Sequence, residues 1–292
     1  MLYGYTNYNS PGTVFSLTPG QGGKWNFQTL YTFTGGKDGY LGATSAALVV
    51  SGGDLYGVAP FGGVMGCFGN GCGTFFRLEP GGQGAPWTET TLIEFKGGDG
   101  PGVPDSVVGP DASGALYVAT AWTTARNDGV VLQYTPSQTQ VITRFSGSHG
   151  GTGPSNLVLG TDGDVYGLAG GRRDSLVFQL APSDGGWART TIAALLSHGY
   201  PVTSLSNGPG GTLVGSVYGD ADFYYGNMFS LTAPGNGRGK WIYHQVWSFT
   251  RGPAYNPISV TVGAGPQQAN LFAVLSGGDT NFGAVAEFKT TQ

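Results

Sequence analysis

The stretches Leu55-Tyr56-Gly57 and Gly73-Thr74-Phe75-Phe76 decide the fold, because a version of each recurs six times along the 292 residues. The first phrase occurs at 2–4, 55–57, 116–118, 165–167, 213–215 and 271–273, and the second at 12–15, 73–76, 129–132, 175–178, 226–229 and 283–286. Successive copies of the first phrase are 48 to 61 residues apart. A period of this length, with β-forming residues in every phrase, is typical of a β-propeller or a β-solenoid.

One full copy shows how the repeating unit is built. Apolar runs at 47–50, 55–59, 74–78 and 88–95 are separated by turns rich in Gly, Pro and Asp. Four short strands joined in this way form one four-stranded antiparallel blade, whose strands we call A to D in chain order.

The copies therefore predict an all-β protein, a single-domain β-propeller over residues 1–292. Six blades are expected, with three strands in each terminal blade, at 2–33, 43–95, 103–145, 154–196, 201–249 and 257–289. Five blades, closed by strands from both ends of the chain, are the alternative, although they would leave strands unused.

Composition excludes several classes of protein. The chain has 55 Gly and 17 Pro, yet 39% of its residues are hydrophobic and 13% are aromatic, which favours a folded protein over a disordered one. The net charge is -4 and Lys and Arg do not cluster, so we expect no nucleic-acid partner. No apolar run is long enough to predict a membrane span. We expect a monomer without a cofactor.

The two cysteines, Cys67 and Cys72, lie within one Gly-rich loop. Their spacing favours a local disulfide over two free thiols. A zinc site would need two further ligands at suitable spacing, so no metal is expected. Met1 leads directly into the first strand phrase, so we expect no leader in this chain, which fits a cytoplasmic protein or the mature form of an exported one.

The order Leu-Tyr-Gly, Gly-Thr-Val-Phe, Trp and then Gly-Gly-x-Asp-Gly resembles the Gloeo/Verruco-type repeat of bacterial, mostly exported proteins. The match is best at 2–39 and 55–100, and weaker copies extend it over essentially the whole chain. The resemblance implies a secreted or cell-envelope protein and supports the propeller. It implies no activity, because the family has no agreed catalytic motif.

Binding residues are expected on the loops of one face. In a propeller the B–C loops and the loops from D to the next A emerge together, and here they are longer and more varied than the A–B turns. The D–A loops carry Asp38 and Asp99 in the best copies, but His149 and His198 in two later ones. Other polar and aromatic residues of the same face are Trp122, Arg126, Asp128, Arg172, Arg173, Asp174, Tyr224, Tyr225, Arg251 and Tyr255.

One interpretation is a single, non-repeated pocket for a small or glycan-like anionic ligand. His149 and His198 would be the acid–base pair, the arginines would bind a carboxylate, and the aromatic residues would form the walls. A metal-independent lyase or cyclase acting on a uronate-containing glycan or a small carbonyl compound would need this combination.

The alternative is a change without function. Asp and His both stabilise turns by bonding to local backbone, so the histidines could replace Asp neutrally. The protein would then be a secreted lectin-like or protein-binding propeller without catalysis. Trp25, Trp87, Trp187 and Trp241 recur at the start of strand D, and we expect them to pack blade against blade.

Overall fold

The computed structural model contains strands and short turns, and its longest helical segments are the 3-10 turns Gln21–Gly23 and Pro209–Gly211 among the residues described. The described residues are 1–6, 11–41, 48–67, 69–82, 85–98, 100–122, 129–146, 151–170, 175–195, 201–219, 225–235, 239–252, 255–263, 270–277 and 283–289. Within them, no helix is both long and apolar enough to cross a membrane.

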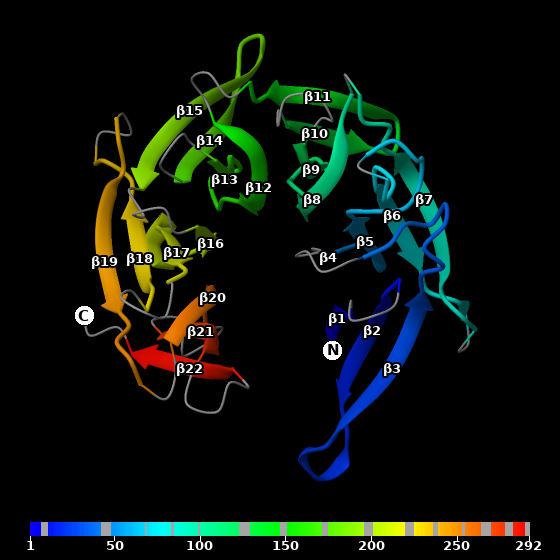
Figure 1. Ribbon diagram of the computed structural model, residues 1–292, viewed down its shortest axis with the longest axis horizontal. Helices are drawn as coiled ribbons and strands as arrows, with labels where there is room; N and C mark the ends of the chain where they lie inside the picture. Colours follow the sequence, from blue (N-terminus) through cyan, green and yellow to red (C-terminus); the bar gives the residue numbers. More distant parts are fainter. Residues whose placement is uncertain are drawn as a thin grey trace. The chain divides into compact units, whose positions relative to one another are not determined.

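The strands form six separate antiparallel sheets, each a meander (Figure 1). The first three are β1 (Leu2–Thr6), β2 (Thr13–Pro19) and β3 (Trp25–Thr32); β4 (Leu48–Ser51), β5 (Asp54–Ala59), β6 (Thr74–Glu79) and β7 (Thr88–Glu94); and β8 (Gly102–Val108), β9 (Leu116–Trp122), β10 (Val130–Thr135) and β11 (Gln138–Arg144).

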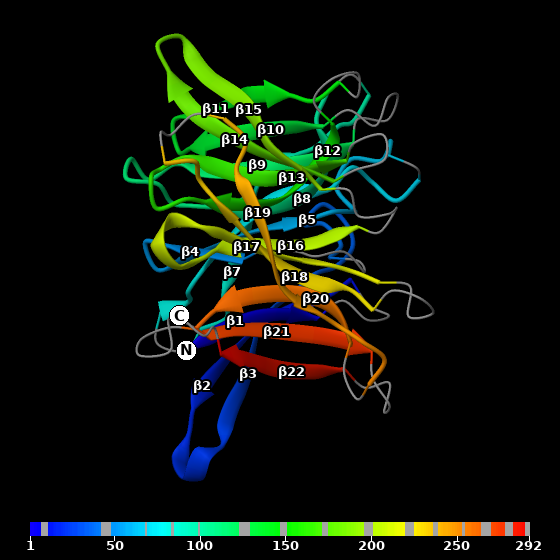
Figure 2. The same cartoon turned by 90° about the vertical axis from the view of Figure 1, so that its left-hand side faces the viewer.

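The remaining three sheets are β12 (Thr152–Leu159), β13 (Val165–Gly170), β14 (Ser175–Ser183) and β15 (Gly186–Leu195); β16 (Val202–Asn207), β17 (Leu213–Val217), β18 (Asn227–Thr232) and β19 (Ile242–Ser248); and β20 (Tyr255–Val262), β21 (Asn270–Gly277) and β22 (Ala284–Lys289). Figure 2 shows the last three side by side. The prediction of an all-β, six-bladed propeller with three-stranded terminal blades is confirmed, and the five-blade alternative is wrong.

The chain divides into two compact units, Met1–Leu157 and Val158–Gln292. The first contains the first three sheets and the beginning of β12, and the second contains the rest. The single domain over 1–292 stays a prediction.

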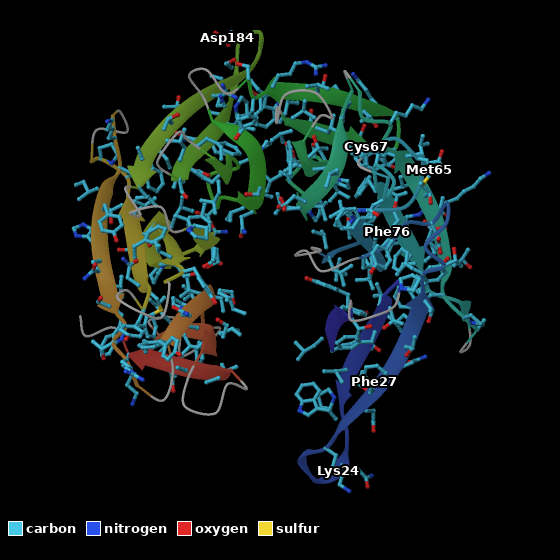
Figure 3. All side chains as sticks on the ribbon, in the orientation of Figure 1. Lys24, Phe27, Met65, Cys67, Phe76 and Asp184 are labelled. Carbon is cyan, nitrogen blue, oxygen red and sulfur yellow. A yellow bond between two sulfur atoms is a disulfide. The ribbon has the colours of Figure 1, made fainter. Side chains whose placement is uncertain are left out.

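A Gly–Phe pair explains why the two phrases recur together. Gly57 on β5 lies opposite Phe76 on β6, and a side chain at position 57 would overlap the Phe76 ring. Phe76 is completely buried and is labelled in Figure 3. The ring therefore crosses strand B at a point where only glycine leaves room. The same pairing joins Gly4 to Phe15, Gly167 to Phe178, and Gly215 to Phe229.

The two blades without this pair have changed both positions. Val118 lies opposite Leu132 in the third blade, and Ala273 lies opposite Ala286 in the sixth. A larger residue on strand B is thus accompanied by a smaller one on strand C, which preserves close packing.

A second glycine, the one that begins the Gly-Thr-Val-Phe phrase, connects successive sheets. A Cβ atom at Gly73 would lie 2.5 Å from Cδ of Pro104, at the start of the next sheet, and Gly226 faces Pro257 in the same way at 2.6 Å. The carbonyl of Gly73 also accepts a 3.0 Å hydrogen bond from the amide of Phe95. This glycine therefore ties the end of strand D to strand C of its own blade and contacts strand A of the next.

Strand D carries a β-bulge at one equivalent position in five blades. The C–D register shifts beside Phe15, Phe76, Leu132, Phe178 and Phe229. Bulges increase the local twist of a strand. The repeat therefore fixes the twist of the outer strand as well as the packing.

The tryptophans at the start of strand D pack between blades, as expected. Trp87 contacts Tyr3 edge-on at 6.3 Å between ring centroids, and Trp241 contacts Tyr166 at 5.4 Å. Trp25, on the β2–β3 hairpin whose tip carries Lys24 (Figure 3), is instead 52% exposed. Blade-to-blade packing is therefore seen for two of these side chains, not for every copy.

Candidate functional site

Most residues of the predicted site lie outside the described part of the chain. These are His149, His198, Arg126, Asp128, Arg172, Arg173, Asp174 and Tyr224. Trp122 ends β9, but its side chain is not described. The structure describes Tyr225, Arg251 and Tyr255, together with the two cysteines.

Tyr225 and Tyr255, which are 30 residues apart in sequence, come together in the second unit. Their rings meet edge-on with centroids 5.3 Å apart, and the backbone amide of Asn256 donates a 3.0 Å hydrogen bond to the carbonyl of Tyr225. Tyr255 lies opposite Gly277 on β21, where a side chain would overlap the Tyr255 ring. Because Gly277 has no side chain, the Tyr255 ring can pack over this position.

A polar cluster that sequence reasoning missed lies beside these rings. Asn256 is 4% exposed and has a φ of 55°, and its Oδ1 accepts the amide of Gly219 at 3.2 Å. The Ser276 hydroxyl donates to the Asn256 carbonyl at 3.2 Å and lies 3.4 Å from the Tyr218 hydroxyl. The signal in the sequence was Asn256-Pro257, because Asn accepts a positive φ and Pro restricts the residue before it.

An open surface hollow of about 530 Å³ in the sixth blade shares Ser276 with this cluster. Ser276 provides a hydroxyl at its surface, and the other lining residues are Ile258, Val274, Leu275, Gly283, Ala284 and Val285. Ser276 and Gly283 flank the B–C connection, so the hollow reaches the loop end of the blade where binding residues were expected. Its wall is mainly apolar.

Arg251 follows β19 on the D–A side and is exposed. It precedes Tyr255 by four residues, so a cation and an aromatic ring are carried by one short connection. Arg can bind a carboxylate with two parallel hydrogen bonds. Of the predicted site, the structure therefore brings together Tyr225 and Tyr255, while Arg251 is exposed.

The D–A loop of the first blade shows what the repeat aspartate does. Asp38 is 8% exposed, and its carboxylate accepts hydrogen bonds from the Thr34 amide at 2.7 Å, the Thr34 hydroxyl at 2.6 Å and the Tyr31 hydroxyl at 3.1 Å. Burial, followed by the charge of Asp38, raises the pKa of Tyr31. Asp38 therefore holds its loop in shape.

This arrangement bears on the two histidines at the corresponding positions. A neutral imidazole has one acceptor nitrogen, so it cannot accept the three bonds that Asp38 accepts. His149 and His198 would not be equivalent replacements for the aspartate, and the loops that carry them need other stabilising contacts. The choice between a catalytic and a turn-forming role stays open.

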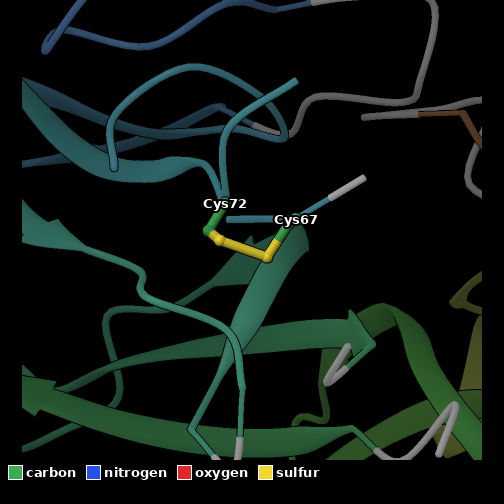
Figure 4. Close-up of a disulfide and its surroundings, with 2 residues drawn as sticks. All are labelled: Cys67 and Cys72. Atoms are coloured by element: carbon green, nitrogen blue, oxygen red, sulfur yellow. A yellow bond between two sulfur atoms is a disulfide. The ribbon is translucent and has the colours of Figure 1, made fainter. Parts of the chain in front are cut away.

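The predicted disulfide is present between Cys67 and Cys72, with Cα atoms 4.8 Å apart (Figure 4). Both cysteines are buried in the apolar cluster between the second and third sheets. The carbonyl of Cys72 accepts the amide of Val103 at 2.8 Å, so the stapled B–C loop is tied to the start of β8. Among the described residues, no group of His, Cys, Asp and Glu is arranged to hold a metal ion.

The stapled loop also holds an aromatic pair. Tyr40 and Phe61 exchange two backbone hydrogen bonds, of 2.8 and 3.2 Å, and their rings are 6.1 Å apart. Both rings are partly exposed. The pair occupies the same place in the second blade as Tyr255 and Gly277 in the sixth, at the loop end of the A–B strands.

The repeating sheets and this irregular loop face define a class of protein, a six-bladed β-propeller with non-repeated loops. The family model described as the Gloeobacter/Verrucomicrobia repeat matches residues 44–286. The chain belongs to this repeat family. No curated protein matches the sequence.

Solved structures of similar fold include several enzymes. A gluconolactonase from Xanthomonas campestris is 13% identical with a TM-score of 0.53, and the alignment covers 89% of this chain and 75% of that one. A luciferin-regenerating enzyme is 12% identical with a TM-score of 0.55, covering 95% and 84%. Virginiamycin B lyase from Staphylococcus aureus is 14% identical with a TM-score of 0.51, covering 99% and 84%. At these identities the likeness concerns the fold.

Proposed function

We propose that the protein binds an anionic, sugar-like ligand at the loop end of its fifth and sixth blades. The observation that carries the proposal is the edge-on contact of Tyr225 and Tyr255 at the loop end of these blades. An open surface hollow of about 530 Å³ on the sixth blade is a second feature of the same end. Aromatic rings bind the apolar faces of sugar rings, and both tyrosines are partly exposed. Arg251 lies on the same connection as Tyr255 to pair with a carboxylate. A uronate-containing glycan combines both features.

The lyase hypothesis from the sequence, which assigns acid–base roles to His149 and His198, is a separate proposal, and both residues lie outside the described part of the chain. One imidazole takes the proton from the carbon beside the carboxylate, and the C–O bond to the leaving sugar breaks as the carbon–carbon double bond forms. The other imidazolium gives its proton to the leaving oxygen. The gluconolactonase and the lyase among the structural neighbours support catalysis on a propeller of this kind.

Binding is tested by calorimetric titration with a uronate disaccharide and with the neutral disaccharide of the same linkage. The parent should bind the uronate more tightly, and Arg251→Ala should reduce that preference about tenfold, the loss of roughly 1.4 kcal/mol. Tyr255→Ala should weaken both ligands. Lys24→Ala, which removes the same charge from the β2–β3 hairpin, is the control. Equal binding of the two sugars by the parent would contradict the proposal.

Catalysis is tested separately with His149→Ala and His198→Ala, alone and combined. The ultraviolet absorbance of the new double bond measures turnover, and thermal unfolding measures stability. A catalytic role predicts lost turnover with ligand binding kept. A lower melting temperature with unchanged turnover per folded molecule would assign the histidines to the turns.

A lectin-like function without catalysis is the second candidate, and the Tyr40–Phe61 pair favours it. Aromatic rings at equivalent places in two blades would provide repeated stacking sites. The stoichiometry of the same titration separates the candidates, because a single pocket binds one ligand per chain and repeated sites bind more. Phe61→Ala should lower the stoichiometry only in the second case.

We also propose that the protein is a monomer outside the cytoplasm, in the secreted or cell-envelope fraction. The buried disulfide supports this, since such bonds persist in oxidising compartments. Light scattering and fractionation of the native host test the two statements.

A further inference from the structure

Asp105 occupies an irregular position at the edge of the third sheet. On β8, Pro104 pairs with Thr120 and Ser106 with Ala119, so Asp105 is the extra residue of a β-bulge. Equivalent bulges place Thr203 on β16 and Ile258 on β20. Bulges redirect side chains. The three blades thus carry an acid, an alcohol and a hydrocarbon at one structural position.

The neighbouring serines show that β8 and β16 meet the next strand A in the same way. The Ser106 hydroxyl accepts the amide of Leu157 on β12 at 3.2 Å, and the Ser204 hydroxyl accepts the amide of Val260 on β20 at 3.0 Å. Both residues of the first contact belong to the first unit, which ends at Leu157. Leu157 and Val260 are therefore corresponding residues.

This correspondence defines what lies beside Asp105. In the second unit, the Thr203 hydroxyl lies 2.9 Å from the Ser216 hydroxyl, which can donate to it, and 3.3 Å from the Ser216 carbonyl. It can therefore donate its own proton to the carbonyl of Pro257, three residues before Val260, at 3.0 Å. The corresponding carbonyl for Asp105 is that of Pro154, three residues before Leu157. A carbonyl needs a donor, and an aspartate provides one only when it is protonated.

We propose that Asp105 makes the contact between β8 and β12 sensitive to protons. The protonated acid donates to the Pro154 carbonyl, as Thr203 does to Pro257. When Asp105 loses its proton, the carboxylate can no longer donate there, and the hydrogen bond that the described residues give it is the one from the amide of Asn156, 3.3 Å away. The contact is therefore strongest in mildly acidic solution.

The surroundings of Asp105 agree with this arrangement. Burial raises its pKa to about 6, against the lowering effect of the Asn156 amide. The titratable residues on the described strands packed against β8 are Asp54, Tyr56, Arg77, Glu79 and Tyr117. Arg77 pairs with Glu79 at 2.7 Å and Asp54 at 3.9 Å, and Tyr117 donates to Asp111. These charges are engaged with one another.

The sign of the pH effect follows from the pKa. The folded protein holds the proton more tightly than the unfolded chain, whose Asp titrates near 3.8. Stability from this group is therefore present below about pH 4 and is lost as the pH rises through about 6. Asp105→Thr replaces the acid by the residue of the fifth blade and should keep the donor at every pH.

The experiment compares parent and Asp105→Thr by urea unfolding from pH 4 to pH 8. As the pH rises, the variant should become more stable relative to the parent. Its unfolding equilibrium constant should fall about tenfold to a hundredfold relative to that of the parent, and the difference should level off above pH 7. An unchanged difference across the range would overturn the proposal. A second variant, Thr203→Asp, should bring the same pH dependence to the β16–β20 contact.

A measurement on the parent protein tests the proposal even if a variant folds poorly. Carbon NMR of the parent, assigned with Asp105→Asn, measures the carboxyl pKa in the intact protein. A value near 6 is expected, and a value of 4 or below would sink the proposal whatever the variants do. Sugar binding is not involved, so this result is independent of the proposed function.

Discussion

The hydroxyl of Tyr166 donates a 2.6 Å hydrogen bond to Asp162, linking the second strand of the fourth blade to the turn that precedes it. Tyr117 and Asp111 make the same 2.6 Å bond in the third blade. In both blades a strand-C glutamine, Gln179 or Gln133, donates to the tyrosine oxygen. Burial, with the neighbouring aspartate next, raises the pKa of both tyrosines. The tyrosine of the repeat phrase thus stabilises the A–B turn through a hydrogen bond.

Tyr166→Phe should lower the free energy of unfolding by about 1–3 kcal/mol, because the charge-assisted bond to Asp162 is lost while the ring still packs against Trp241. Chemical denaturation measures the loss. Tyr218→Phe, whose hydroxyl meets an exposed serine rather than a carboxylate, is the matched control and should cost less. Equal effects would show that the carboxylate bond contributes nothing.

Asp111→Asn should make the free energy of unfolding depend less on pH in acidic solution. Burial raises the pKa of Asp111, but hydrogen bonds from Tyr117, Ser113 and Ala115 outweigh it, so the pKa is lowered overall. Stability from this carboxylate is present above the unfolded pKa and is lost as the pH falls through the lower folded value. Unfolding of parent and variant should differ at pH 7 and converge toward pH 2. A constant difference would contradict this assignment.

Gly57→Ala should destabilise the second blade by roughly 1–3 kcal/mol, because the added methyl group overlaps the buried Phe76 ring. Gly82→Ala is the control, since a side chain there meets nothing within 4 Å. The double variant Gly57→Val and Phe76→Leu copies the pair of the third blade and should recover part of the loss of Gly57→Val alone. No recovery would mean that the two positions are not coupled.

Removal of the disulfide by Cys67→Ala and Cys72→Ala should cost about 2 kcal/mol, the value expected for so short a closed loop. Thermal unfolding with and without a reducing agent provides the measurement, and the double variant should no longer respond to the reductant. If reductant lowered the melting temperature of the variant as it does that of the parent, the effect would not come from this bond.

The sequence predicted the blades closely because the features that build them are local and repeated. Gly57 and Phe76 stand in recognisable phrases, and the turns between them carry Gly, Pro and Asp. The polar cluster at Asn256 and the bulge at Asp105 escaped prediction, because each depends on register between strands. A bulge changes which residues face one another without changing the alternation of residue types.

The predicted site stays a prediction, because most of its residues lie outside the described part of the chain. Tyr225 and Tyr255 were expected on one loop face, since both flank strands whose order the repeat fixes. Their ring contact was seen only in the structure. Ser276 could not be predicted, because serines are too frequent in this chain to be selected by type. The structure shows the position of Ser276 through its hydrogen-bond contacts with Tyr218 and Asn256 and through its place in the lining of the hollow.

The contact of Gly73 with Pro104 and of Gly226 with Pro257 has a consequence for how such chains can be lengthened. A cut between two sheets would place the glycine and the proline that it contacts on different fragments. Both new ends would then lack this contact. A cut in the tight hairpin between the first two strands keeps each such couple on one fragment. Engineered duplication or deletion of a module should therefore be spliced at that hairpin, where Gly52 and Gly53 have no neighbours to disturb.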